Sequence, residues 1–165
     1  MKTLNQYIKE KLIINKDYSD GKMYHPKSFD ELRKIIDDRY DKLGAGTKRN
    51  PIDFNDIDVS NISSFCNDND KGIFEGTKFK YIDISDWDVS NVTNMTRMFC
   101  WCKELESIGD ISKWDVSKVN SMIHMFFDCK KFNQDISNWD VSNVMGRVGM
   151  FYGCPIKNEY EPKFK

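Results

Sequence analysis

Long apolar runs, basic clusters and an export signal are missing from this sequence. No stretch of the 165 residues approaches the ~18–20 apolar residues of a membrane-spanning helix. The 25 lysines and arginines are scattered and balanced by 26 acids, so the clustered positive face needed for non-specific nucleic-acid binding is absent. Residues 1–14 are charged and amphipathic, unlike a signal peptide. We therefore expect no nucleic-acid partner and a protein that is cytoplasmic, or virion-associated and released by lysis. A cell-surface location would require a leader that has been removed.

Histidine and cysteine are too scarce to define a metal centre. The two histidines, His25 and His124, are far apart in the sequence, and the cysteines number five, which is odd. Cys100 and Cys102 form a lone Cys-x-Cys pair, which is weak as a zinc motif. No arrangement of nucleophile, base and orienting residue is recognisable, and no phosphate-binding loop. The sequence therefore predicts a non-enzymatic protein in a reducing compartment, with no cofactor, no metal and no disulfide framework.

What the sequence does contain is a repeat. The heptapeptide Trp-Asp-Val-Ser-Asn-Val-Thr begins at Trp87, close copies begin at Trp114 and Trp139, and a degenerate copy begins at Ile57. Aligned on their aspartates, the four copies recur after 30, 27 and 25 residues, which lies within the range of solenoid repeats. The repeated columns include tryptophans, aspartates, methionines and cysteines: Trp87, Trp114 and Trp139; Asp88, Asp115 and Asp140; Met95, Met98, Met122 and Met125; Cys102, Cys129 and Cys154.

The apolar spacing changes within each copy. From Val119 to Phe126 the apolar residues fall at steps of three, three and one, which is typical of one face of a short α- or 3₁₀-helix. The stretch Lys131–Trp139 suits a short strand followed by a turn. We therefore predict units of strand, turn, short helix and turn. Stacked units would place parallel strands on one side and helical segments on the other.

The extended pattern resembles a known family. It runs Trp-Asp-Val-Ser-Asn-Val-x-x-Met-x-x-Met-Phe-x-x-Cys-x-x-Phe-x-x-Asp-Ile-Ser, and its best copy lies between Trp114 and Ser137. This pattern is similar to the repeat of BspA-like surface proteins, a branch of the leucine-rich repeats. The resemblance covers about residues 52–157. It implies a right-handed leucine-rich-repeat-like solenoid that acts in protein binding or adhesion. The last copy carries Arg147 in place of a methionine, as terminal units often depart from the pattern.

The repeats leave both ends of the chain to be explained. Three to four units are near the minimum for a stable solenoid, so a cap is expected. One helix is expected over about residues 3–14, and a second opens with a capping box at Ser28 and Glu31 and ends at Gly44. We predict an α+β repeat protein with an N-terminal helical cap (1–50), a solenoid of three to four repeats (51–157) and a tail (158–165), with a hinge at 43–51.

Each repeated column permits a functional and a structural interpretation. Stacked aspartates ~5 Å apart repel one another unless calcium neutralises them, which would make the protein a calcium-dependent adhesin. Alternatively, each aspartate accepts a backbone N–H at a turn, and the Asp-Val-Ser-Asn sequence favours this role. The tryptophans are expected to pack between copies with their indole N–H on a carbonyl. The methionines are expected in the core, and the cysteines as small buried filler.

Residues outside the columns are the better candidates for ligand contact. Trp101 stands where other copies carry Asp128 and Gly153, so we expect it to be exposed and to be the leading contact residue. Variable polar residues on the strand side would complete a ligand face on a rigid scaffold. The expected partner is a protein first and a glycan second. An alternative is a phage-encoded virion or host-interaction protein, such as an inhibitor. The candidate polar residues are Lys80, Tyr81, Glu106, Ser107, Asn133 and Gln134.

Overall fold

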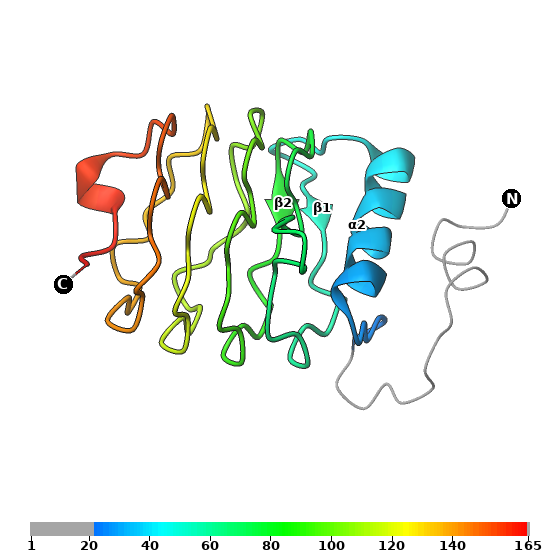
Figure 1. Cartoon of the computed structure of the whole chain (residues 1–165). Helices are drawn as coiled ribbons and strands as arrows, with labels where there is room; N and C mark the ends of the chain where they lie inside the picture. The colour runs from blue at the N-terminus through cyan, green and yellow to red at the C-terminus, as the bar shows by residue number, and fades with distance from the viewer. Residues whose placement is uncertain (1–21, 165) are drawn as a thin grey trace, which may run out of the picture.

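The computed structural model describes residues 22–164, and most of their backbone is irregular. The regular elements are one helix, α2 (Phe29–Leu43), the strands β1 (Ile52–Asp53) and β2 (Ile82–Asp83), and the 3₁₀-helix η1 (Asn158–Tyr160). β1 and β2 form a parallel two-stranded sheet. Figure 1 shows α2 at one end of the described chain and the C-terminal segment at the other, with successive turns of backbone side by side between them. The helix expected over residues 3–14 lies outside the described residues.

Helix α2 begins and ends where the sequence predicts. The Ser28 hydroxyl accepts the N–H of Glu31 at 3.2 Å, which satisfies one of the free donors of the first turn. The Glu31 carboxylate accepts the N–H of Lys27 at 2.8 Å, one residue before the position expected for a capping box. Gly44 ends the helix with a φ of 72°, a conformation that glycine adopts without steric cost. The predicted second helix is therefore confirmed.

Helix α2 packs on the first repeat copy through an apolar face and one buried cation. The Arg39 side chain is 8% exposed, lies 2.7 Å from the Asp56 carboxylate, and covers the Phe54 ring at 5.0 Å from its centroid. Because a buried charge without its partner is costly, this pair fixes where the helix docks. On the predicted apolar face, Leu32, Ile35 and Ile36 are buried, Phe29 and Tyr40 are partly buried, and Leu43 is 42% exposed.

The segment 43–51, where the sequence predicts a hinge, contacts the second copy through its backbone. The Ala45 carbonyl accepts the N–H groups of Lys80 and Tyr81 at 2.7 and 3.3 Å. Gly46 has a φ of 74°, and a Cβ atom there would lie 2.2 Å from the Tyr81 carbonyl oxygen. Glycine therefore lets the backbone approach the second copy closely, and hydrogen bonds hold the segment there.

Within the repeat, the backbone adopts neither of the elements expected there. The structure has no helix over Val119–Phe126 and no strand over Lys131–Trp139. The chain instead forms successive tight turns, in which the N–H groups of Met98, Cys100 and Cys102 donate to the carbonyl three residues earlier at 3.0–3.2 Å. Because such turns share the three-residue period of a 3₁₀-helix, the apolar spacing alone does not distinguish them.

Parallel backbone bridges join equivalent positions of successive copies. Ser64 pairs with Asn94, Asn94 with Ser121, and Ser121 with Gly146. Beyond the pairing of β1 with β2, the same side of the repeat has a single parallel bridge between Tyr81 and Ser107. The sequence predicts a parallel strand in every copy, which the structure does not have.

The hydrogen bonds along the turn segments that follow these bridges run in one direction. In two successive copies, alternate N–H groups donate to the carbonyls of the next copy at 2.7–3.0 Å. Each of these copies therefore presents N–H groups to the copy after it and carbonyls to the copy before it. The donors are Met95, Arg97, Phe99 and Trp101 in one copy and Met122, His124, Phe126 and Asp128 in the next.

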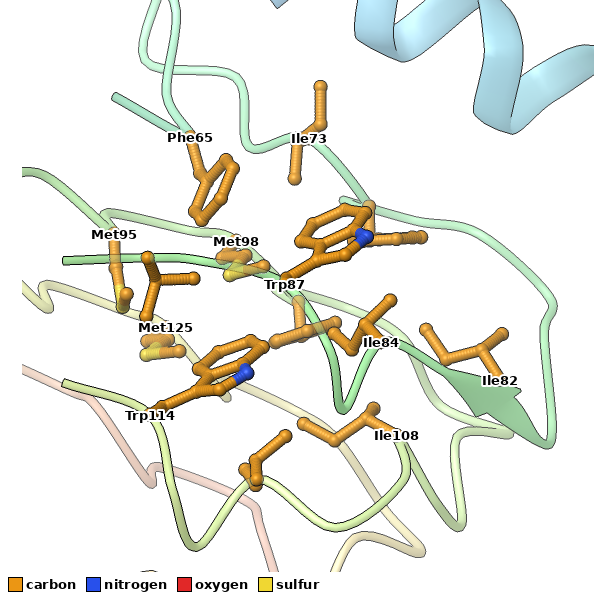
Figure 2. Close-up of a cluster of buried hydrophobic side chains, with 14 of the residues drawn as sticks. Phe65, Ile73, Ile82, Ile84, Trp87, Met95, Met98, Ile108, Trp114 and Met125 are labelled. Atoms are coloured by element: carbon orange, nitrogen blue, oxygen red, sulfur yellow. The ribbon is translucent and has the colours of Figure 1, made fainter. Parts of the chain in front are cut away.

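The repeated apolar columns form the interior, as expected. Phenylalanine rings stack through the copies at centroid distances of 5.3 Å (Phe74–Phe99), 5.4 Å (Phe99–Phe126) and 5.9 Å (Phe126–Phe151). Figure 2 shows Trp87 and Trp114 from successive copies in similar orientations, near Met98 and Met125 respectively. The four methionines of the two middle copies are fully buried, and the three repeat tryptophans are 3–6% exposed: Met95, Met98, Met122 and Met125; Trp87, Trp114 and Trp139.

The C-terminal segment crosses the last copy. The Ile136 N–H donates to the Tyr160 carbonyl at 3.0 Å, and Pro162 is buried. The Arg147 guanidinium lies 4.8 Å from the centroid of the Phe164 ring. Residues 158–164 therefore pack on the repeat.

A candidate binding surface around Trp101

Trp101 occupies a backbone position that disfavours a bulky residue. Its φ is 59°, and the equivalent residues Gly76, Asp128 and Gly153 have φ values of 70°, 59° and 71°. Glycine and aspartate tolerate this left-handed conformation, whereas a large aromatic residue there is an outlier that costs about 1–2 kcal/mol. The backbone of this turn therefore does not account for a tryptophan.

The Trp101 side chain is 46% exposed and is held by two neighbours. The Arg97 guanidinium lies 5.1 Å from its ring centroid, and the Phe127 ring lies edge-on at 6.4 Å. Arg97 is fixed in turn by Glu75, whose carboxylate accepts at 2.6 and 3.0 Å. Although burial raises the pKa of Glu75, the hydrogen bonds from Arg97 bring that pKa below its ordinary value. The ring is thus presented in one orientation by an ion pair.

Further aromatic side chains extend this surface over the next two copies. Phe127 stacks on Tyr152 with 5.1 Å between centroids, and His124 meets Phe127 edge-on at 5.0 Å. Tyr152 is 70% exposed. Phe127 and Tyr152 occupy the column of Cys100, one position before that of Trp101. An alignment of that column would have revealed these aromatic neighbours in the sequence. We call Arg97, Trp101, His124, Phe127 and Tyr152 the aromatic surface.

A shallow cavity adjoins Trp101. Its volume is about 620 Å³, and its other lining residues are Gly76, Thr77, Lys78, Lys103 and Glu104. The Lys131 ammonium lies 2.8 Å from Glu104. Concave space beside a fixed aromatic ring suits one protruding side chain or sugar ring.

The six polar residues expected on the ligand face are largely engaged within the protein. The Tyr81 hydroxyl donates to the Glu106 carboxylate, which raises the pKa of Tyr81. Gln134 accepts the N–H of Ile108 at 2.8 Å and donates to the Gly109 carbonyl at 2.9 Å.

Two of the remaining members, Asn133 and Ser107, are also bonded within the protein, whereas Lys80 is exposed. The Asn133 side chain accepts the N–H of Lys157 at 3.0 Å, and the Ser107 hydroxyl accepts the N–H of Gly109 at 3.4 Å. Asn133 and Gln134 therefore link successive segments, a role that the sequence did not reveal. The Trp101 ring instead contacts Arg97 and Phe127, its neighbours in the aromatic surface.

The aspartate columns close turns. Asp88, Asp115 and Asp140 each accept the N–H of the serine two residues later at 3.0 Å. The hydrogen bond from Ser117 lowers the pKa of Asp115. This is the turn role favoured by the sequence. Among residues 22–164, no group of three or more histidine, cysteine, aspartate or glutamate side chains is placed to hold a metal ion.

The tryptophan and cysteine columns bond between copies. The indole N–H groups of Trp87 and Trp139 donate to carbonyls of the preceding copy at 2.9 and 3.2 Å. That of Trp114 is buried without a partner in the described chain. The Cys102 and Cys129 thiols donate to preceding carbonyls at 3.0 and 2.9 Å. Burial raises the pKa of Cys102 to about 12, so this thiol is neutral at physiological pH.

These features define a repeat-containing protein whose columns hold neighbouring copies together. Residues 47–162 match the family described as "Mycoplasma protein of unknown function, DUF285". The match spans more than half of the chain, and the chain therefore belongs to this family, which is repeat-containing and related to BspA-like surface proteins. No curated protein and no solved structure matches the chain. None of the helices described within residues 22–164 has the length and apolarity to span a membrane.

Proposed function

We propose that the chain is a short right-handed leucine-rich-repeat-like solenoid that binds another protein and catalyses no reaction. The hydrogen bonds and parallel bridges that join successive copies support the solenoid. Such a scaffold holds variable side chains at fixed spacing. The aromatic surface spans three copies and needs this spacing to be continuous.

The observation that carries the proposed binding role is Trp101. An exposed tryptophan in a left-handed turn costs stability, and strained residues of this kind cluster at functional positions. Tryptophan, tyrosine and arginine dominate the energetics of protein interfaces, and Trp101, Tyr152 and Arg97 all belong to the aromatic surface. A protein partner is favoured over a glycan because this composition matches an interface centre.

The experiment compares the natural chain with Trp101→Gly as baits for proteins extracted from cells that carry the protein. Glycine is the matched substitution, because Gly76 and Gly153 occupy the same turn in other copies. We expect one partner to be captured by the natural chain and lost with the variant. The Kd of this partner for Trp101→Gly should be about thirtyfold or more above its Kd for the natural chain, as for a hot-spot residue.

Two results would contradict this proposal. Capture of the same partner with equal affinity by both baits would remove Trp101 from the interface. Binding to immobilised glycans that depends on Trp101, without any protein capture, would establish the glycan alternative instead.

A further inference from the structure

Along the turn segments that follow the bridges, the hydrogen bonds between copies run in one direction and give the two ends of the repeat opposite polarity. Outside these segments some N–H groups, such as those of Thr93 and Asn120, donate to the preceding copy. In these turn segments the first copy presents carbonyls outward, because no earlier copy donates to them, and the last copy presents N–H groups outward. An end with unpaired backbone groups resembles the edge of a sheet, which is a ready site for pairing with another chain.

The carbonyl end is covered by α2. One guanidinium nitrogen of Arg33 lies 3.2 Å from the Ile73 carbonyl oxygen and 3.4 Å from that of Glu75. These carbonyls occupy the positions that accept N–H groups in later copies. A cation from the helix therefore replaces the missing donors.

The opposite end has no such cover on its backbone. The N–H groups of Arg147, Gly149, Phe151 and Gly153 are equivalent to four N–H groups that are bonded in the preceding copy. None of the four has an acceptor among residues 22–164. The carbonyls of Arg147, Gly149 and Phe151 accept N–H groups within their own turns at 3.0–3.2 Å. We call these four N–H groups the donor edge, since they supply donors without acceptors.

Exposed apolar side chains accompany the donor edge. Met145, Val148 and Tyr152 are 86%, 72% and 70% exposed, and only two other large hydrophobic residues in the described chain are exposed. The equivalent residues of an earlier copy include Asn120 and Ile123, which are polar or partly covered. The C-terminal segment packs on the core but gives no backbone acceptor to the donor edge.

We propose that the donor edge docks an extended acidic segment of a partner protein. Aligned N–H groups carry partial positive charge and attract anions, and Arg147 adds a full charge beside them. A segment rich in carboxylates supplies acceptors in excess of donors, as this edge requires. These donors alternate along the segment, as do the donors that bond the next copy in the preceding copies. Side chains of the docked segment would cover Val148 and Tyr152, as in strand addition.

A second copy of this chain does not fit the donor edge. Two donor edges facing each other would bring N–H groups against N–H groups. The carbonyl end of another copy is already covered by α2 and Arg33. End-to-end stacking of two copies is therefore disfavoured. The backbone donors of this site differ in chemistry from the contact at Trp101, and Tyr152 borders both.

The first test is amide hydrogen exchange of the full chain, followed by NMR, with and without a peptide of alternating aspartate and valine. In the free protein the four donor-edge amides should exchange rapidly, while the bonded amides in the preceding copy are protected. Added peptide should protect the donor edge. Slow exchange of these four amides in the free protein, absence of peptide binding, or binding that leaves them unprotected would each overturn the proposal. The matched internal amides are Met122, His124, Phe126 and Asp128.

The second test removes one donor. Arg147→Pro deletes an N–H that makes no internal hydrogen bond, and the preceding Gly146 tolerates the restriction that proline imposes. The matched control Arg147→Ala keeps the N–H and removes only the side chain. Peptide binding by Arg147→Pro should be about fivefold weaker than by Arg147→Ala, as expected for one lost hydrogen bond.

Two controls establish specificity. A lysine–valine peptide should not bind, and Trp101→Gly should bind the acidic peptide as the natural chain does. Equal affinities of the two Arg147 variants would remove the backbone donor from the site. If Arg147→Pro fails to fold, the exchange test on the natural chain decides the question alone.

Discussion

The two ends of the repeat differ in how their apolar interior and their outward backbone groups are covered. Each terminal copy has an apolar interior that needs cover and a row of backbone groups that needs partners. At the N-terminal end, α2 covers the interior and Arg33 bonds the outward carbonyls. At the C-terminal end, Phe164 packs on the interior while the N–H groups of the donor edge stay unpaired. The docking site that we propose lies at the end whose backbone donors have no acceptor among residues 22–164.

The largest expected effect comes from breaking the N-terminal cover. Arg39→Ala leaves the partly buried Asp56 carboxylate without its cation and opens space between α2 and Phe54. The free energy of unfolding in urea should fall by about 3–5 kcal/mol. The control on the same helix is the exposed Lys34→Ala, which should change it by less than about 0.5 kcal/mol.

The same measurement at the other end sharpens the comparison. Phe164 is only partly buried, so Phe164→Ala should cost clearly less than Arg39→Ala. Equal losses would mean that the two covers contribute equally, against the asymmetry inferred from their contacts.

A loss of unfolding free energy slightly smaller than that of Arg39→Ala is expected for a core substitution midway between the ends. Met125 is fully buried in the third copy, so Met125→Ala should lower the free energy of unfolding by about 2–5 kcal/mol. Met145→Ala, at an exposed position near the open end, should change it by less than about 0.5 kcal/mol. A large loss for Met145 in thermal or urea unfolding would show that the open end is covered in solution.

How far the sequence predicts this structure depends on whether a feature is local, repeated or neither. Helix α2 is predictable because Ser28 and Gly44 act on their own backbone neighbours. The buried columns are predictable because repetition separates the fixed positions from the variable ones. Arg39 is missed because one cation on an apolar face forms no pattern and its partner, Asp56, lies in another segment.

The sequence predicts a short helix within each repeat copy where the structure has tight turns, and the reason is physical. A three-residue apolar step is common to 3₁₀-helix and to successive turns, and the difference lies in hydrogen bonds to the next copy. For the binding surface, Trp101 is predictable as a departure from its column. The structural role of Gln134 is missed because its amide bonds both Ile108 and Gly109, contacts that only the stacked copies create.

Acid should lower the free energy of unfolding through the aspartates in the turns of the repeat, and not through the two ends. Hydrogen bonds from Ser112, Ser117 and Ser137 lower the pKa values of Asp110, Asp115 and Asp135. A carboxyl whose pKa is lower in the folded chain stabilises the fold above its unfolded pKa, and this contribution is lost as pH falls through the folded pKa. Stability should therefore decline between about pH 5 and pH 2.

The matched variant for the acid effect replaces the three aspartates of those turns with asparagine. Asparagine keeps a side-chain oxygen for the serine N–H but does not titrate in this range. Urea midpoints measured against pH should show a shallower decline for the triple variant than for the natural chain. Identical pH profiles would mean that these turns make no contribution to acid sensitivity.

The smallest expected effect comes from uncovering the carbonyl end without disturbing α2. Arg33→Ala removes the donor to the Ile73 and Glu75 carbonyls and also the exposed ion pair with Asp37. Asp37→Ala removes the ion pair alone. Because hydrogen bonds to a charged donor contribute more than an exposed pair, Arg33→Ala should cost about 1.5 kcal/mol and Asp37→Ala about 0.5 kcal/mol or less in urea unfolding. If the two losses are equal, Arg33 acts only as a surface charge and the carbonyl end is as open as the donor edge. If Arg33→Ala costs more, as we expect, the two ends differ in the pairing of their backbone as well as in the cover of their core.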